Sequence, residues 1–453
     1  MNLMRKLTLV FFLLNIFVYS YAQKGSNSPY SFNGLGELNT LDNATFIGLG
    51  NSRISLIDST VVNYYNPASY NSLAKNQPLF SFGVSSRLSK YSENGGSYDA
   101  YLTSIQHFVI AFPFAKRFGL AFGLKPFASK GYDFFTKELI GTDSLQYIYE
   151  GSGSISEGFL GFSGEIFEYR GAKLALGANL GYLFGQVVDT RKSTVLHSGS
   201  LLNSGGINTK TYRVKGLHYT LGLNYTQRIN ERHSVGVSAV FEPFQKISAE
   251  YEEALFYSSN INNPNIYDSL SLNDSLSGNV SNIPTYTVGL SYQFNFKGKK
   301  NSTNPLNSQL ALHATYEVAD WSRYENTFET GVTNSFLASN KYTFGLQYLP
   351  ETDFIRNKQM TKFYHRVKYR AGVYYTQMPY LTNNEQVTDF GTTFGFGIPI
   401  IIKSSLSSVN FGFSYGNRGT SDQNALKESY YGISIGLTIA PGSDKWFVKR
   451  KLN

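Results

Sequence analysis

The chain has 453 residues and a net charge of +9, with 42 Gly, 34 Tyr, 35 Phe and no cysteine. The lack of cysteine excludes structural disulfides, thiolate metal sites and the lipid-modified N-terminus of a bacterial lipoprotein. Beyond residue 22 no uninterrupted apolar stretch reaches 18 residues, which excludes helical membrane spans. The abundance of aromatic residues and glycine indicates an all-β protein.

The first 22 residues have the pattern of a secretory signal peptide. Arg5 and Lys6 precede an apolar run over residues 7–18, and small residues such as Ala22 follow it. These 12 apolar residues are too few for a membrane helix, which needs roughly 20. We therefore expect cleavage after Ala22 and export of a mature chain without an internal linker.

Residues 23–77 lack the pattern of barrel strands and are predicted to form a separate N-terminal segment. Residues 48–52 read GLGNS and residues 58–69 read DSTVVNYYNPAS. Pro67 fixes its own φ and pushes Asn66 out of the α region, while the Asn66 side chain can close a local hydrogen bond. Asn66, Pro67 and Ala68 therefore predict a locked turn, which need not have a role in transport.

From residue 79 onward, apolar and polar residues alternate with the period of a strand that has one apolar face. Between residues 118 and 124, for example, Phe or Leu stands at every even position and Gly or Ala at every odd one. The alternation predicts fourteen strands, at residues 79–91, 101–114, 118–124, 154–167, 174–184, 217–225, 235–241, 286–296, 310–318, 342–348, 367–375, 394–400, 409–415 and 431–439.

Strand and connection lengths favour a transmembrane antiparallel β-barrel over a soluble protein. Most of the predicted strands have at least nine residues, the length that a tilted membrane strand needs. Long connections such as 188–210 and 250–282 alternate with short ones such as 115–117 and 230–232. Outer-membrane barrels have short periplasmic turns and long outer loops. We therefore expect a barrel at residues 78–440 in the bacterial outer membrane, with both termini periplasmic and a basic tail at 441–453. The connection 350–362 is long for a turn and leaves room for one miscounted hairpin.

Motifs for chemistry are scarce in the sequence. The six histidines show no HxH or HExxH spacing, and no GxSxG elbow is present, so we expect neither a metal, a cofactor nor an enzyme activity. His218 and His313 are expected to point into a polar lumen. Basic residues are spread over turns rather than gathered in a stripe, which speaks against a nucleic-acid partner.

The paired tyrosines before Asn66, Pro67 and Ala68, placed between a signal peptide and fourteen strands, resemble the hatch of the FadL/TodX (OMPP1) family of outer-membrane transport proteins. Ser69 departs from that motif, because the family commonly has Gly there. The resemblance implies a fourteen-stranded barrel whose lumen is plugged by residues 23–77. It further implies passive uptake of hydrophobic small molecules such as long-chain fatty acids, which outer loops capture and an opening in the wall releases.

The resemblance also suggests residues for this route. Pro113 and Pro126 each remove a ladder donor in an early strand and are candidates for a wall-opening kink, although they could simply mark strand ends. The candidate apolar contacts for cargo in an outer loop are Phe134, Phe135, Leu139 and Ile140. The expected partners are outer-membrane lipid, a hydrophobic ligand and other envelope proteins.

Two alternatives to transport remain open from the sequence. The first is a plugged, non-transporting barrel that acts as a binding or assembly partner, resembling the accessory barrels of the type IX secretion system. The second is a soluble or surface-displayed protein in which two apolar sheet faces meet in a sandwich.

Overall fold

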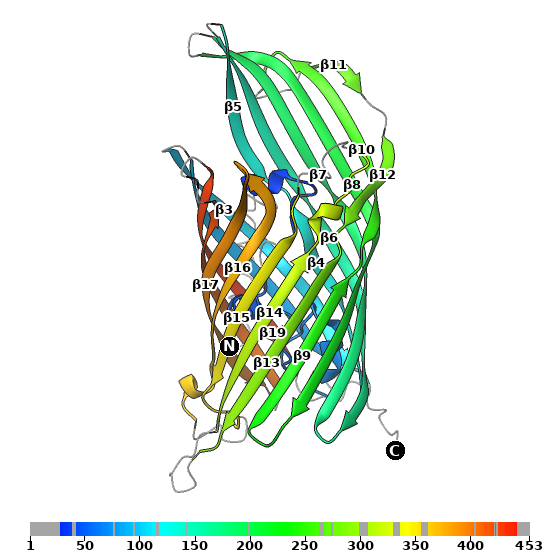
Figure 1. The fold of residues 1–453 in the computed structure, drawn as a ribbon, viewed down its shortest axis with the longest axis vertical. Coiled ribbons are helices and arrows are strands. Elements are labelled where there is room, and N and C mark those ends of the chain that lie inside the picture. The colour runs from blue at the N-terminus through cyan, green and yellow to red at the C-terminus, as the bar shows by residue number, and fades with distance from the viewer. Residues whose placement is uncertain are drawn as a thin grey trace, which may run out of the picture.

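A computed structural model describes residues 28–441, apart from 39–41, 76–77, 94–95, 115–116, 142, 198–199, 262–266, 273–274, 299–306, 329–335, 355–360, 403–404, 421 and 423–424. The predicted signal peptide and all but the first residue of the predicted basic tail lie outside the described residues. The wall is a closed antiparallel barrel of 14 strands, as expected (Figure 1). The fourteenth strand closes it by pairing with the first, from Lys427 opposite Ser92 to Ile439 opposite Phe80.

The wall strands in chain order are β2 (Leu79–Glu93), β3 (Gly96–Pro113), β4 (Phe118–Ser129), β6 (Asp143–Tyr169), β7 (Ala172–His197), β8 (Ser200–Arg228), β9 (His233–Glu242), β13 (Thr285–Phe296), β14 (Ser308–Ala319), β15 (Ser339–Leu349), β16 (Lys368–Thr382), β17 (Glu385–Ile402), β18 (Ser405–Gly419) and β19 (Lys427–Ile439). β15 pairs directly with β16, so the fourteen-strand count holds across the long connection between them.

The wall carries its apolar residues outward and its polar residues inward. On β19, Ile435 is 49% exposed whereas its neighbour Ser434 is 1% exposed. Ile435, Val84 and Ile105 follow one another across β19, β2 and β3 and belong to the same outward band. An apolar exterior around a polar interior is the pattern of a barrel in a bilayer. The sandwich hypothesis was wrong, because the apolar faces do not meet.

The predicted outer loops are largely strand. β6, β7 and β8 have 27, 26 and 29 residues, and their ladders continue far beyond the apolar band. Together with β5 (Tyr132–Ile140), β10 (Gln245–Ser258), β11 (Tyr267–Leu272) and β12 (Leu276–Asn282) they form a curved sheet that rises above the rest of the barrel (Figure 1), here called the outer extension. Above the membrane neither face must be apolar, so these strands pair without the alternation on which the prediction relied.

The segment before β2 lies inside the barrel, as the hatch hypothesis predicts. It contains η1 (Pro29–Phe32), β1 (Glu37–Leu38), α2 (Ala44–Ile47) and η2 (Pro67–Ser72). The first described residue lies by the outer extension, where Ser28 N–H donates to the Gly131 carbonyl between β4 and β5 (2.9 Å). The segment then descends to the end of the barrel with the short turns, where β2 begins. Within the described residues, no helix is long and apolar enough to cross a membrane.

The apolar band predicts that a charged substitution destabilises the barrel more within the band than outside it. Replacing Ile435 by Arg should destabilise the barrel by about 2–4 kcal/mol, because the guanidinium would face hydrocarbon. The same change at Tyr257, which is exposed on β10 of the outer extension, should have little effect. Urea titration of both variants in lipid vesicles measures the free energies of unfolding. Equal costs at the two positions would contradict the assignment of the band.

Candidate functional site

Residues 63–70 form the locked turn that the hatch motif predicts. Asn66 caps η2, with its Oδ1 accepting from Ala68 N–H (3.1 Å) and its Nδ2 donating to the Ile54 carbonyl (3.0 Å). Pro67 opens the 3-10 helix as its first residue. The Asn63 amide donates to the carbonyls of Arg53 and Leu56. These bonds are made within the hatch and hold its fold independently of the wall.

Inward-facing wall residues hydrogen-bond the hatch from several sides. Tyr70 of the hatch donates to Asn179 of β7 (2.9 Å). His107 of β3 lies within hydrogen-bond reach of Asn43 and Tyr64. His313 of β14 contacts Ser55 (3.2 Å) and so points into the lumen, as expected, while His218 is also buried there beside Glu157 (3.2 Å).

Glycines on ten wall strands bring the hatch into contact with the wall, and six of them face hatch backbone atoms. A Cβ on Gly345 would stand 2.5 Å from the Leu49 oxygen, and one on Gly412 would stand 2.7 Å from the Ala44 oxygen. A Cβ on Gly372 would overlap the Gly50 nitrogen. Any side chain at these positions would push the hatch away from the wall. We call this set the glycine ring, and it comprises Gly119, Gly161, Gly177, Gly222, Gly289, Gly345, Gly372, Gly395, Gly412 and Gly436.

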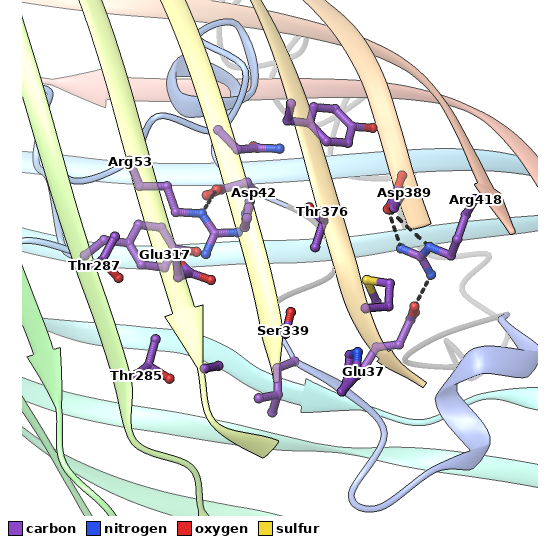
Figure 2. Close-up of a pocket in the computed structure, with 18 of the residues that line it drawn as sticks. Glu37, Asp42, Arg53, Thr285, Thr287, Glu317, Ser339, Thr376, Asp389 and Arg418 are labelled. Carbon is purple, nitrogen blue, oxygen red and sulfur yellow. Dashed lines mark hydrogen bonds and ion pairs between the residues drawn. The ribbon is translucent and has the colours of Figure 1, made fainter. Parts of the chain in front are cut away.

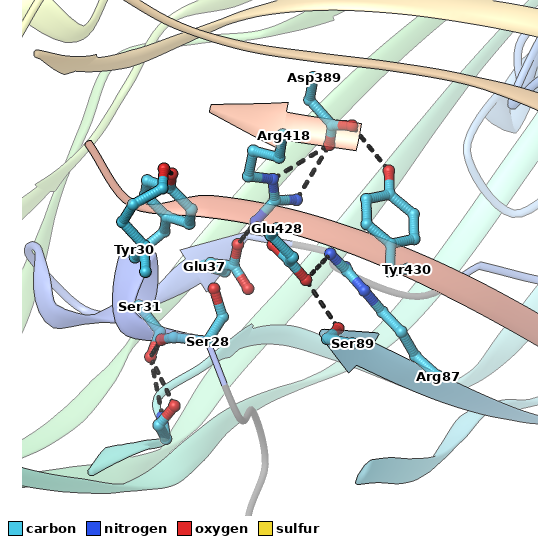
Figure 3. A network of polar contacts seen from close by, with 12 residues as sticks. Ser28, Tyr30, Ser31, Glu37, Arg87, Ser89, Asp389, Arg418, Glu428 and Tyr430 are labelled. Carbon is cyan, nitrogen blue, oxygen red and sulfur yellow. Dashed lines mark hydrogen bonds and ion pairs between the residues drawn. The ribbon is translucent and has the colours of Figure 1, made fainter. Parts of the chain in front are cut away.

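Buried ion pairs tie the outer end of the hatch to the wall (Figure 3). Arg418 of β18 bonds both Glu37 of β1 and Asp389 of β17, the latter at 3.0 Å. Arg87 of β2 pairs with Glu428 of β19 at 2.5 Å, and Glu428 lies 3.5 Å from Arg418. One connected set of charges therefore joins four wall strands and the hatch.

A second ion pair holds the hatch near the other end of the barrel. Asp58 of the hatch is bonded to the Lys368 ammonium at the start of β16 and to Thr60. Burial alone would raise the pKa of Asp58, but the Lys368 ammonium and the Thr60 bonds outweigh burial and hold that pKa below its ordinary value. The Asp58 carboxyl is consequently ionised at neutral pH.

The lumen that remains above the hatch is a polar chamber of about 240 Å³ (Figure 2). Its charged lining residues are Glu37, Asp42, Arg53, Arg87, Glu242, Glu317, Lys341, Asp389 and Arg418. Arg53 and Asp42 form an ion pair at 2.5 Å within the hatch. Among the described residues, no group of three or more His, Asp or Glu side chains is placed to hold a metal ion. The chamber therefore offers charge and hydrogen bonds next to apolar surface, which comes from residues such as Ile54, Met378 and Tyr380.

The outer mouth is closed by residues 320–328, which connect β14 towards β15 and are here called the cap segment. Thr327 N–H donates to the Asn279 carbonyl of β12 (3.1 Å), so the cap segment pairs with the inner face of the outer extension. Phe328 stacks on Tyr251 with 5.2 Å between ring centroids, and Trp321 lies 5.7 Å from Phe336. One of two buried apolar clusters thus lies inside the outer extension at the mouth, and the other is built around the hatch.

Within the described residues, the wall strands β3 and β4 are paired over only part of their length, and we call the gap between them the seam. Their ladder has six pairs, from Phe108 opposite Leu124 to Pro113 opposite Gly119, whereas β2 pairs with β3 along nearly its whole length. Beyond Leu124, the free edge of β4 pairs instead with β1 of the hatch, Ala128 opposite Leu38. The two strands therefore part about halfway across the wall.

The predicted site residues are distributed around the seam and the outer extension. Pro126 lies two residues beyond the last β3–β4 pair and next to a bulge in the β4–β6 ladder, whereas Pro113 ends β3. The predicted loop residues lie on β5 instead of in a loop. Phe134 stacks on Tyr149 at 5.1 Å. The other three are exposed, namely Phe135, Leu139 and Ile140.

Sequence analysis missed the charged chamber, the glycine ring and the cap segment. Glu317 and Lys341 face the lumen from β14 and β15 and were visible as charges at the inward positions of alternating strands. The cap segment was signalled by aromatic residues in a presumed outer loop, such as Trp321 and Tyr324.

The sequence matches the BamG family model over residues 3–453. The chain belongs to the BamG family. No curated protein matches it. The FadL-like barrel expected from the hatch motif is confirmed at the level of the fold, while the matching family model carries the name BamG and not FadL/TodX.

Solved structures with a similar fold are described as channels or transporters. The CymD monoaromatic hydrocarbon channel has a TM-score of 0.51 and 14% identity, with 88% of this chain and 98% of that chain covered. The Ralstonia pickettii toluene transporter TbuX has a TM-score of 0.51 and 14% identity, with 89% and 99% covered. At this identity the similarity establishes a shared barrel architecture, and the BamG-family chain is an outer-membrane barrel.

The glycine ring should be intolerant of even one methyl group. We expect Gly372→Ala to loosen the hatch and to cost about 1–3 kcal/mol of stability, because the new Cβ would overlap the hatch backbone. Gly158→Ala is the matched control, since a Cβ on this β6 glycine would meet only side-chain atoms at 3.5 Å or more. Limited proteolysis within residues 28–77 reports the loosening. Identical protection in the two variants would show that the hatch is not held by this contact.

Arg418 should be a key residue for the hatch's outer end. Arg418→Met should cost about 3–5 kcal/mol, because it leaves the buried Glu37 and Asp389 carboxylates without their common partner. Lys297→Met, which breaks an exposed pair with Glu231, should change little. The midpoint temperature of thermal unfolding measures the loss of stability in each variant. Similar midpoints for Arg418→Met and Lys297→Met would contradict the importance of the buried network.

Proposed function

We propose that this BamG-family chain is a plugged outer-membrane barrel that acts as a binding or assembly partner for other envelope proteins. The observation that carries the proposal is the glycine ring, which fits the hatch to ten of the wall strands. A displaceable plug would need space or water between hatch and wall, whereas here backbone atoms touch. Moving the hatch would also separate the buried Glu37–Arg418 and Asp58–Lys368 ion pairs, which is costly.

The chemistry of the chamber supports the same proposal. Five carboxylates and four basic groups line it, so an acyl chain or an aromatic hydrocarbon that filled the chamber would remove water from charged groups at a cost in free energy. Many apolar side chains of the lumen pack instead in the cluster beneath the cap segment and in the cluster around the hatch. A barrel that is closed by the hatch and again by the cap segment is better suited to binding other proteins at its surface than to conducting a solute.

The outer extension supplies such a surface. Its strands reach beyond the membrane band and expose apolar side chains, among them Leu139 (82%) and Leu272 (62%). Apolar residues exposed on an aqueous surface commonly mark sites of protein contact. An envelope protein is the partner class that could reach them.

A second candidate function is the passive uptake of hydrophobic small molecules such as long-chain fatty acids. It is favoured by the seam between β3 and β4, where a cargo could leave sideways without crossing the hatch. CymD and TbuX, which share the fold, are described as a hydrocarbon channel and a toluene transporter. In this scheme Phe134, Phe135, Leu139 and Ile140 would meet the cargo first, and Pro126 would help to keep the seam open.

Two measurements on intact cells distinguish these functions. We expect uptake of labelled oleate to be the same with and without the protein, and an affinity-tagged copy extracted in mild detergent to co-purify with other outer-membrane proteins at fixed stoichiometry. Oleate uptake that depends on the protein, with a solitary barrel after extraction, would replace the proposal by the transport function.

A further inference from the structure

The edge of β3 at the seam is a strand edge within the membrane band. On the side facing β4, its ladder stops at Phe108, and residues 102–107 have no strand partner there within the described part of the chain. Two carbonyls of this stretch accept local side-chain bonds, from Ser104 Oγ to the Ile105 carbonyl (3.2 Å) and from Gln106 Nε2 to the Ser104 carbonyl (3.3 Å). Such local bonds do not replace a ladder of backbone pairs.

The depth of this edge makes its open ladder costly. Ile105 is 56% exposed and lies in the same row as Val84 and Ile435 of the apolar band. In hydrocarbon each unsatisfied backbone group costs several kcal/mol, because neither water nor an acyl chain can hydrogen-bond it. Only another polypeptide backbone offers donors and acceptors at the spacing of a strand.

We propose that the β3 edge over residues 102–107 docks an extended strand of another outer-membrane protein, which continues the wall across the seam. This inference rests on the proposed partner-binding function and gives it a location. Strand addition supplies affinity through main-chain hydrogen bonds and specificity through alternate side chains. The partner strand should carry apolar residues beside Ile105 on its lipid side and small or polar residues beside Ser104 on its lumen side.

One edge of the seam is already paired with a strand that lies inside the barrel. β1 of the hatch pairs with the edge of β4 through Glu37 opposite Ser129 and Leu38 opposite Ala128. Glu37 is held in place by Arg418, so the β4 edge is paired at residues 128–129, whereas the β3 edge over residues 102–107 has no strand partner in the described part of the chain. The two edges therefore differ in occupancy, and the β3 edge is the one that a partner can use.

Site-specific photo-crosslinking in living cells tests the docking. A benzophenone amino acid replaces Ile105 in one copy and Ile435 in another, at matched band level and similar exposure, 56% and 49%, but with Ile435 on a strand paired along both edges. We expect a discrete protein adduct at position 105 and none at 435. Lipid adducts alone at both positions would overturn the docking.

A pair of proline variants tests the role of the backbone. Adjacent residues of a strand direct their N–H groups to opposite edges, so one of Thr103→Pro and Ser104→Pro removes a donor from the open edge and the other from the β2–β3 ladder. The variant that keeps a heat-resistant barrel should lose the Ile105 adduct about tenfold, the effect of one lost backbone bond. An undiminished adduct in that variant would overturn strand docking.

The outcomes separate the two proposals. Co-purification of an envelope protein with no protein adduct at position 105 would overturn docking at the seam and leave the plugged binding barrel intact. Protein-dependent oleate uptake without any co-purifying protein would overturn both.

Discussion

A backbone group that lies in hydrocarbon must find a hydrogen-bond partner within the protein, because the bilayer offers none. Because of this constraint, β19 pairs with β2 and closes the barrel. Apolar side chains such as Ile435 face lipid, whereas polar side chains such as Ser434 are buried inside. A closed barrel of fourteen strands has a hollow interior. The hatch and the cap segment fill most of that interior. The seam between β3 and β4 is the place where the described chain meets the constraint least well, and it is therefore where an external partner is most useful.

Two kinds of contact hold the hatch in the barrel, and each kind depends on the other. Glycines such as Gly345 and Gly372 let the hatch backbone approach the wall, and this closeness excludes water from the ion pairs around it. The pairs of Arg418 and Lys368 in turn fix the hatch at its two ends. Above it, the cap segment places aromatic rings where a ligand-conducting barrel would keep an open apolar mouth. The charged chamber between hatch and cap segment is what remains of the lumen.

Much of this fold was predictable because its pattern is local. Strict alternation between residues 118 and 124 fixes which side faces lipid, and Pro67 after Asn66 fixes a turn, whatever surrounds them. The strands of the outer extension were missed because they do not face lipid, so the strict alternation of the apolar band is lost while the backbone pairing persists, as in β6 from Asp143 onward. The glycine ring was missed for a different reason, since a glycine in a strand does not reveal which distant backbone it must admit. The predicted contact residues Phe135, Leu139 and Ile140 are exposed on β5 rather than in a loop, and their role in binding stays a prediction.

The central claim is that hatch and cap segment together close the barrel. Ion conductance of the purified, intact protein in a planar lipid bilayer measures that closure directly, with an open porin reconstituted in parallel as the control. The account predicts insertion without stepwise current at any moderate voltage. Regular single-channel steps from the intact chain would contradict it, because such steps require a continuous water path past the hatch and the cap segment.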